Sequence, residues 1–169
     1  MRVFILEDDK TRIAMFREAL IGADVTVAMD VEGAKKAWQP PYSLMLLDHD
    51  LGDRTFVDQD DENCGTAFVK WLTEYYKDLG PEMVPFTLVH SWNIAAADWM
   101  ENWLCDFGAK TQAFPFGKTL LEAIVKLVEE TKEKEQATLV QKEREQQARM
   151  QTQEFAGWGA YWNPDACYD

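Results

Sequence analysis

Three short clusters of polar residues in this 169-residue chain have side chains that could do chemistry. Each cluster directly follows an apolar run, and the three are Glu7-Asp8-Asp9, Asp48-His49-Asp50 and His90-Ser91-Trp92-Asn93. Carboxylates that converge on a small volume repel one another unless a cation neutralises them. Oxygen-rich sites of this kind prefer Mg²⁺, Mn²⁺ or Ca²⁺ to zinc. If the apolar runs end at one place, the clusters predict a divalent metal site there.

The two histidines of the chain, His49 and His90, both belong to these clusters. A histidine near neutrality can transfer a proton or donate a hydrogen bond to a phosphate oxygen. Because neighbouring side chains of a strand point to opposite faces, we expect Asp48 and Asp50 to point together and His49 to point away. The alternative for each histidine is a hydrogen-bonded structural role, and for Asp8 it is helix capping.

The elements that would position these clusters alternate between strand and helix. Apolar runs typical of buried strands cover residues 2–7, 25–29, 44–47, 84–89 and, more weakly, 110–114. Apolar residues at helical spacing follow each run. Five such repeats predict an α/β protein with a doubly wound, five-stranded parallel sheet of the flavodoxin-like type. In these sheets ligands bind at the carboxyl ends of the strands, where the three clusters fall.

The composition changes twice beyond this predicted domain, which we place at residues 1–130. Residues 131–153 are rich in Glu, Lys, Gln and Arg and predict a charged, solvated helical extension. Residues 154–169 contain five aromatic residues, Phe155, Trp158, Tyr161, Trp162 and Tyr168. So many aromatic side chains predict a tail that packs on this chain, on a copy of it, or on a separate protein partner.

The net charge of −13 lies mainly in the predicted domain. Residues 1–117 carry ten basic and twenty acidic side chains, whereas residues 118–150 carry seven of each. A domain this acidic repels nucleic acid over most of its surface, which argues against duplex DNA bound along a basic face. The sequence has neither a long apolar run nor a signal peptide, so we expect no membrane segment and a cytoplasmic protein. The three scattered cysteines are expected to be free thiols.

Several of these residues resemble those of response-regulator receiver domains. The resemblance rests on Ile5-Leu6-Glu7-Asp8-Asp9, Leu46-Leu47-Asp48 and the Pro115-Phe116 turn. Receivers hold Mg²⁺ with an acidic pair and a phospho-accepting aspartate. The resemblance matches Glu7 and Asp8 to that pair and Asp48 to the acceptor.

Two positions depart from the receiver pattern. His90 stands where receivers have Thr or Ser, and Phe114 stands where they have a lysine that contacts the phosphoryl group. These departures argue against an ordinary phosphorelay switch, unless Lys118 takes the place of that lysine.

A more specific resemblance is to the cyclic-phosphate-processing receiver branch, which has a DHDLG motif and an HS-x-N motif. Here these motifs read Asp48-His49-Asp50-Leu51-Gly52 and His90-Ser91-x-Asn93, and the resemblance covers about residues 1–128. It implies metal-assisted processing or binding of a cyclic phosphate or phosphate ester, on a nucleotide or an RNA end. A metal-dependent phosphodiesterase or phosphohydrolase is one form of this function, and binding without turnover is the other.

The resemblance also implies roles for individual residues. Glu7, Asp8 and Asp48 would hold Mg²⁺ or Mn²⁺. The catalytic residues would be Asp48, His49 and His90, with His90 as general acid. The residues expected to contact the substrate are Asp50, Ser91, Asn93 and Lys118.

Two functions without chemistry remain open at this point. The first is a degenerate receiver that regulates a protein partner through its sheet edge or its aromatic tail. The second is an acidic mimic of nucleic acid that occupies a basic protein. Neither needs a metal ion or turnover, so assays of cyclic phosphates separate both from the leading hypothesis.

Overall fold

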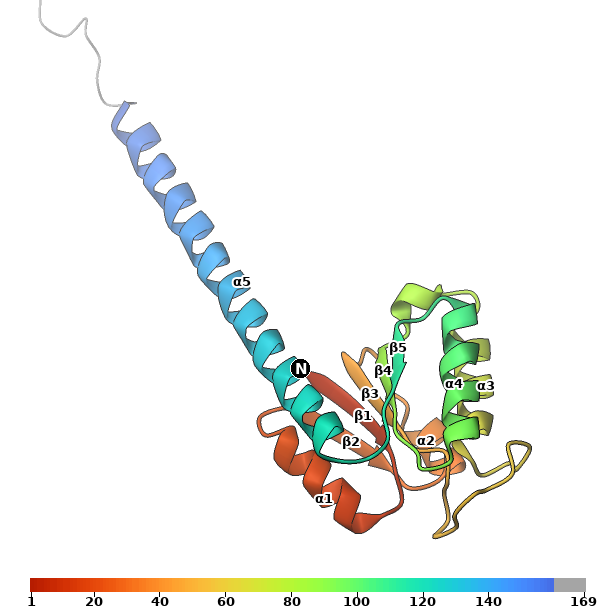
Figure 1. The fold of residues 1–169 in the computed structure, drawn as a ribbon. Coiled ribbons are helices and arrows are strands. Elements are labelled where there is room, and N and C mark those ends of the chain that lie inside the picture. Colours follow the sequence, from red (N-terminus) through yellow and green to blue (C-terminus); the bar gives the residue numbers. More distant parts are fainter. Residues whose placement is uncertain (160–169) are drawn as a thin grey trace, which may run out of the picture. The chain divides into compact units, whose positions relative to one another are not determined.

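The computed structural model describes the backbone of residues 1–159 and the side chains of residues 1–150. Strands and helices alternate along this part of the chain, as Figure 1 shows. The strands are β1 (Arg2–Leu6), β2 (Asp24–Ala28), β3 (Leu44–Leu47), β4 (Phe86–Val89) and β5 (Thr111–Ala113). The helices are α1 (Lys10–Ala19), α2 (Val31–Ala37), α3 (Gly65–Tyr76), the 3₁₀ helix η1 (Pro81–Met83), α4 (Ile94–Phe107) and α5 (Lys118–Gly159).

The five strands form one parallel sheet in the order β2-β1-β3-β4-β5. This arrangement confirms the predicted α/β class and the doubly wound sheet. The chain moves to one side of β1 to form β2 and then to the other side to form β3, so the strand order switches between β1 and β3. In open α/β sheets, ligands bind at the carboxyl ends of the strands beside such a switch.

Helices cover both faces of the sheet, and each face has its own apolar core. On one face, Phe4, Leu6 and Met45 pack with residues of α2, α3 and α4. On the other face, Val3 and Ile5 pack with α1 and with the first turns of α5. Alternate residues of β1 therefore serve opposite cores, which is the two-residue period expected of a strand buried on both sides.

The chain divides into a compact unit, Met1–Val128, and a second unit that begins at Glu129. Helix α5 contributes Leu120, Ile124 and Val128 to the core of the first unit. Most side chains from 129 to 150 are exposed, and the side chains of the predicted aromatic tail lie outside the described residues. The proposed division at residues 130 and 153 stays a prediction. No helix within residues 1–159 is long and apolar enough to span a membrane.

Helix α3 approaches the end of β3 so closely that its first residue must lack a side chain. A Cβ atom on Gly65 would lie 2.3 Å from the carbonyl oxygen of Asp48 and 2.8 Å from the Cα of His49. The Gly65 N–H also donates to the His49 carbonyl at 2.9 Å. Glycine is therefore required here by contact with the backbone.

We predict that Gly65→Ala lowers the free energy of unfolding by about 2–3 kcal/mol, because α3 or the residues after β3 must move. Urea unfolding measures this loss. The matched control is Gly117→Ala, since a Cβ at Gly117 would have nothing within 4 Å. The control is expected to change stability by no more than about 0.5 kcal/mol. Equal effects of the two substitutions would contradict the close approach.

Candidate functional site

Three polar side chains lie together where β1, β3 and β4 end. Leu6 pairs with Leu47 and Leu47 pairs with Val89, so the next residues, Glu7, Asp48 and His90, are side by side on three adjacent strands. Each can offer one ligand atom such that these atoms all lie within 4.8 Å of one another. Glu7 and His90 are fully buried, and Asp48 is 1% exposed.

Arg12 of α1 supplies positive charge to this cluster. Its Nη2 atom lies 3.0 Å from Glu7 Oε1 and 2.8 Å from Asp48 Oδ2. Asp9 begins α1 by accepting from the backbone N–H groups of Thr11 and Arg12, which directs Arg12 over the strand ends. One guanidinium thus bridges the two buried carboxylates.

Sequence reasoning missed Arg12, although a local signal for it existed. The first turn of a helix disfavours positive charge because of the helix dipole. A basic residue three positions after the capping Asp9, beside the acidic cluster, therefore indicates a partner outside the helix. Arg12 is a partly buried cation that meets the predicted need of the carboxylates for positive charge.

Burial makes both carboxylates of the cluster hard to ionise. Desolvation, followed by repulsion from Asp48, raises the pKa of Glu7 to about 8. Desolvation also raises the pKa of Asp48 to about 6, against the lowering effect of Arg12 and of hydrogen bonds that include one from Ser91. The Arg12 charge is therefore not enough to restore the ordinary acidity of the two groups.

His90 is enclosed beside these carboxylates without a hydrogen bond to its ring. Its ring lies 4.7 Å from the ring of Phe16, and its Nδ1 is 3.7 Å from Glu7 Oε2. Neither ring nitrogen has a hydrogen-bond partner among the described residues. Burial, and then the charge of Arg12, lower the pKa of His90 to about 3, so the ring is neutral at neutral pH. A neutral buried imidazole is better suited to offer a lone pair than to act as the general acid expected above.

Asp8 is turned toward a backbone group and is not part of the three-residue cluster. Its Oδ2 accepts from the N–H of Asp53 at 2.5 Å, which ties the end of β1 to the loop after the DHDLG motif. Asp8 is 8% exposed. Of the three expected metal ligands, the structure groups Glu7 with Asp48 and adds His90 in place of Asp8.

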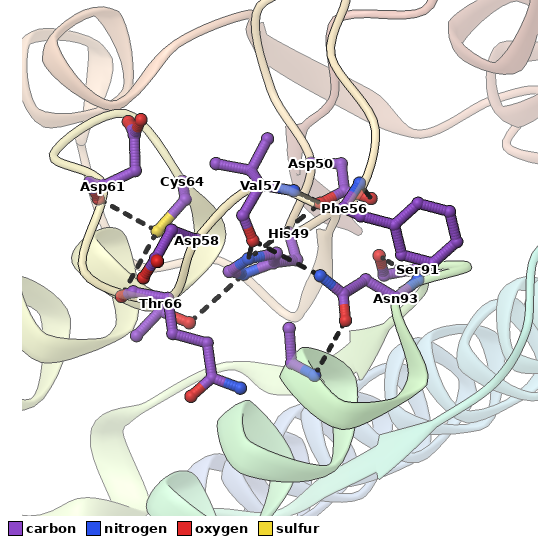
Figure 2. A network of polar contacts seen from close by, with 12 residues as sticks. His49, Asp50, Phe56, Val57, Asp58, Asp61, Cys64, Thr66, Ser91 and Asn93 are labelled. Carbon is purple, nitrogen blue, oxygen red and sulfur yellow. Dashed lines mark hydrogen bonds and ion pairs between the residues drawn. The ribbon is translucent and has the colours of Figure 1, made fainter.

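The other residues of the DHDLG motif build the loop beside the cluster, as Figure 2 shows. Asp50 accepts from the N–H groups of Phe56 at 3.0 Å and Val57 at 2.9 Å. His49 lies on the opposite side of its strand from Asp48, where Nε2 donates to the Val57 carbonyl at 3.1 Å and Nδ1 contacts Thr66 at 3.2 Å. Both ring nitrogens of His49 are thus engaged with the protein.

The second motif meets the first at the same peptide unit. The side-chain amide of Asn93 donates to the Val57 carbonyl at 3.4 Å, and its carbonyl oxygen accepts from the Ala96 N–H to begin α4 (Figure 2). Ser91 Oγ accepts from the Asn93 N–H at 3.2 Å. Ser91 and Asn93, expected to bind substrate, therefore also hold the local backbone.

A pocket of about 320 Å³ opens above Asp48. Two arginines, Arg12 and Arg54, and two aromatic residues, Trp92 and Phe116, are part of its lining. Its remaining lining residues are Asp9, Thr11, Met15, Asp48, Asp50 and Thr55. The pocket therefore combines carboxylates for a cation with guanidinium groups for an anion, which is the pairing that a metal-bound phosphate requires.

Lys118 is not among the residues that line the pocket. Its ammonium group lies 3.4 Å from Glu122 in the first turn of α5, and its side chain is 88% exposed. Phe114, at the position where receivers have a lysine, packs with the apolar core of the α1 face. The cation that reaches Asp48 is Arg12, from a different element.

The fold and the arrangement of the strand ends define a receiver-type domain. Two solved structures share the fold. The non-phosphorylated receiver domain of HemR from Leptospira biflexa is 20% identical, with 75% of this chain and 92% of that chain covered and a TM-score of 0.53. The response regulator TrrA from Thermotoga maritima, in complex with Mg²⁺-BeF, is 18% identical, with 75% and 97% covered and a TM-score of 0.50.

The sequence itself identifies the branch of this class. Residues 1–106 match the family described as the cyclic-phosphate processing receiver domain, and the chain belongs to that family. The match confirms the resemblance inferred from the two motifs. A comparison with curated proteins finds no match.

We predict that Glu7→Gln stabilises the metal-free protein increasingly as pH rises. The raised pKa values of Glu7 and Asp48 mean that the folded state binds protons more tightly than the unfolded chain does. Stability from these groups is complete near pH 4 and is lost as pH rises to about 8. Glutamine cannot ionise, so the variant's advantage should grow between pH 5 and pH 9, to the order of a few kcal/mol.

Urea unfolding at several pH values, with a chelator present, measures this difference. Glu18→Gln, on the exposed side of α1, is the control for loss of one acidic side chain. A difference between Glu7→Gln and wild type that stays constant over this pH range would contradict the assigned pKa of Glu7.

We also predict that Asp50→Ala loosens residues 53–57 by removing the acceptor of two backbone N–H groups. Hydrogen exchange at Phe56 and Val57 should quicken, and the free energy of unfolding should fall by about 1–3 kcal/mol. Asp58→Ala is the matched control, because Asp58 accepts from the Asp60 N–H in the exposed part of the same loop. Unchanged exchange at Phe56 and Val57 in Asp50→Ala would contradict this role.

Proposed function

We propose that this domain binds and opens a cyclic phosphate on a nucleotide or an RNA end, with the help of a divalent metal ion. The observation that carries the proposal is the position of the pocket. The pocket places Arg12, Arg54 and Asp48 around one small volume, and Asp48 itself belongs to the buried cluster with Glu7 and His90. Membership in the cyclic-phosphate processing receiver family supports the choice of substrate.

The donor atoms of the cluster fit a divalent cation. Glu7 Oε2 and both ring nitrogens of His90 have no hydrogen-bond partner within the described part of the chain. Buried polar atoms without partners are costly, so a cation that contacts them compensates for their burial. Glu7 and Asp48 are the carboxylates that would hold Mg²⁺ or Mn²⁺, and TrrA, with the same fold, is in complex with Mg²⁺-BeF.

The chain's own residues have separate tasks in this reaction. Arg12 presents a guanidinium group, which binds phosphate oxygens in forked pairs. The guanidinium of Arg54 is paired with Asp61 at 2.8 and 3.2 Å, so Arg54 would have to leave Asp61 to bind a phosphate in this way. Asp50 holds the loop that carries Arg54, and Trp92 and Phe116 form apolar parts of the pocket lining. A bound divalent ion polarises a phosphoryl oxygen and makes water more acidic. Hydrolysis adds one water across a ring P–O bond, with its proton going to the leaving oxygen.

Arg12 is expected to stabilise the charge that develops on the phosphoryl group. It already lies against Asp48 and Glu7, so a phosphate in the pocket offers it a further acidic partner. In this proposal Arg12 takes over the task of the missing receiver lysine. A lysine and an arginine differ here, since the planar guanidinium can contact two oxygens at once.

We predict that the protein converts 2′,3′-cyclic AMP to a phosphomonoester when Mn²⁺ is present. Asp48→Asn and Arg12→Gln should each lower kcat/KM by about 100-fold or more, because each removes a charge that faces the reacting group. Phosphorus NMR or chromatography of the product measures the rate. The controls are Asp98→Asn on α4 and Arg17→Gln on α1, which are exposed residues outside the pocket.

The outcome separates turnover from the alternatives. Binding of the cyclic nucleotide without product would reduce the function to recognition. If the protein neither binds the cyclic nucleotide nor forms product with Mg²⁺ or Mn²⁺, the proposal is overturned. That result would favour a degenerate receiver that acts on a protein partner. Labelling of Asp48 by acetyl phosphate would instead support a phosphorelay.

A further inference from the structure

His90 is the one member of the cluster whose chemistry differs from that of an ordinary receiver site. Its ring is fully buried against Phe16, and both nitrogens lack hydrogen-bond partners among residues 1–150. Nδ1 faces Glu7 Oε2 at 3.7 Å, which is too long for a direct hydrogen bond. Within this part of the chain, no group donates a hydrogen bond to the ring nitrogen of His90 that carries the lone pair.

We propose that His90 is a metal ligand, and that Glu7, Asp48 and His90 form a mixed nitrogen–oxygen centre selecting a first-row transition-metal ion over Mg²⁺. This assignment rests on the proposed function, which locates a divalent ion at the cluster. It adds the chemical class of that ion, which the carboxylates alone leave open.

Two physical reasons favour a transition metal here. Imidazole nitrogen suits ions such as Zn²⁺, Fe²⁺ and Ni²⁺, whereas Mg²⁺ is held by oxygen. Mg²⁺ also gives up its water reluctantly and usually keeps several water ligands. The three side chains are at most 1% exposed, so an ion among them must lose much of its hydration. Both effects weaken the binding of Mg²⁺ relative to the binding of Mn²⁺, Fe²⁺ or Zn²⁺.

The distances allow this centre with a small closure. With metal–ligand bonds of about 2.1 Å, neighbouring ligand atoms lie about 3.0–3.4 Å apart. The three candidate atoms lie within 4.8 Å of one another, and His90 Nδ1 is 3.7 Å from Glu7 Oε2, so side-chain movements of about an ångström close the set.

Arg12 must give way when such an ion binds. Its Nη2 contacts Glu7 Oε1 and Asp48 Oδ2 from α1, so the ion and the guanidinium compete for Asp48 Oδ2. Arg12 also lines the pocket, where its guanidinium can bind an anion instead. Metal and phosphate are therefore expected to bind cooperatively, each relieving the charge that the other introduces.

The test uses Mn²⁺ with the untagged full chain, and its readout is the magnetic coupling of Mn²⁺ to a nitrogen nucleus. Electron spin-echo envelope modulation should detect one imidazole nitrogen in the wild type. His90→Thr, which restores a receiver-type residue, should abolish the nitrogen signal and weaken Mn²⁺ binding by about tenfold or more. Mg²⁺ binding should change little. Calorimetry gives the two affinities.

His49→Gln is the matched control, since the chain has only two histidines and His49 is engaged by Val57 and Thr66. This variant should retain the nitrogen coupling. The inference is overturned if the wild type shows no nitrogen coupling, or if His90→Thr shows the same coupling as the wild type. The wild-type measurement does not depend on the folding of any variant.

The same samples distinguish this failure from failure of the proposed function. Nitrogen coupling without opening of 2′,3′-cyclic AMP would uphold the mixed centre and reject catalysis. Opening that proceeds equally with Mg²⁺ and Mn²⁺, without nitrogen coupling, would uphold catalysis and reject the mixed centre.

Discussion

The need for positive charge at three adjacent strand ends shapes this domain. Parallel pairing in register places Glu7, Asp48 and His90 side by side on one face of the sheet, whatever their charges. Burial, followed by repulsion from Asp48, raises the pKa of Glu7, and burial raises the pKa of Asp48. The protein meets part of this need with Arg12, and the metal ion of the proposed function would meet the remainder.

The fold and the position of the site could be predicted from the sequence because both depend on local patterns. Apolar runs of strand length, each ending in polar residues, define the sheet and its ligand-binding edge. The motifs then select the branch of receivers to which the chain belongs. These signals lie within a few residues of one another and do not depend on side-chain packing.

The division of tasks within the site could not be read from the same patterns. The strand's alternation predicts that His49 and Asp48 point apart, but the partners of His49 belong to α3 and to the loop that follows the motif. The depressed pKa of His90 depends on burial beside Phe16 of α1, far away in the sequence. Lys118 lies near the receiver lysine in sequence, yet its partner in the structure is Glu122. The surroundings of His49 and His90 depend on packing between different elements of the chain, whereas the Lys118–Glu122 pair lies within α5 at i,i+4 spacing.

The backbone N–H and carbonyl of Val57 link the two family motifs. Its N–H is held by Asp50, and its carbonyl by His49 and by Asn93, which lies 36 residues away. The segment that carries Arg54 and Thr55 into the pocket is thus anchored at one end by residues of both motifs. Loss of His49 or of Asn93 would remove one of the two hydrogen bonds that the Val57 carbonyl accepts, so each motif makes good part of what the other could lose.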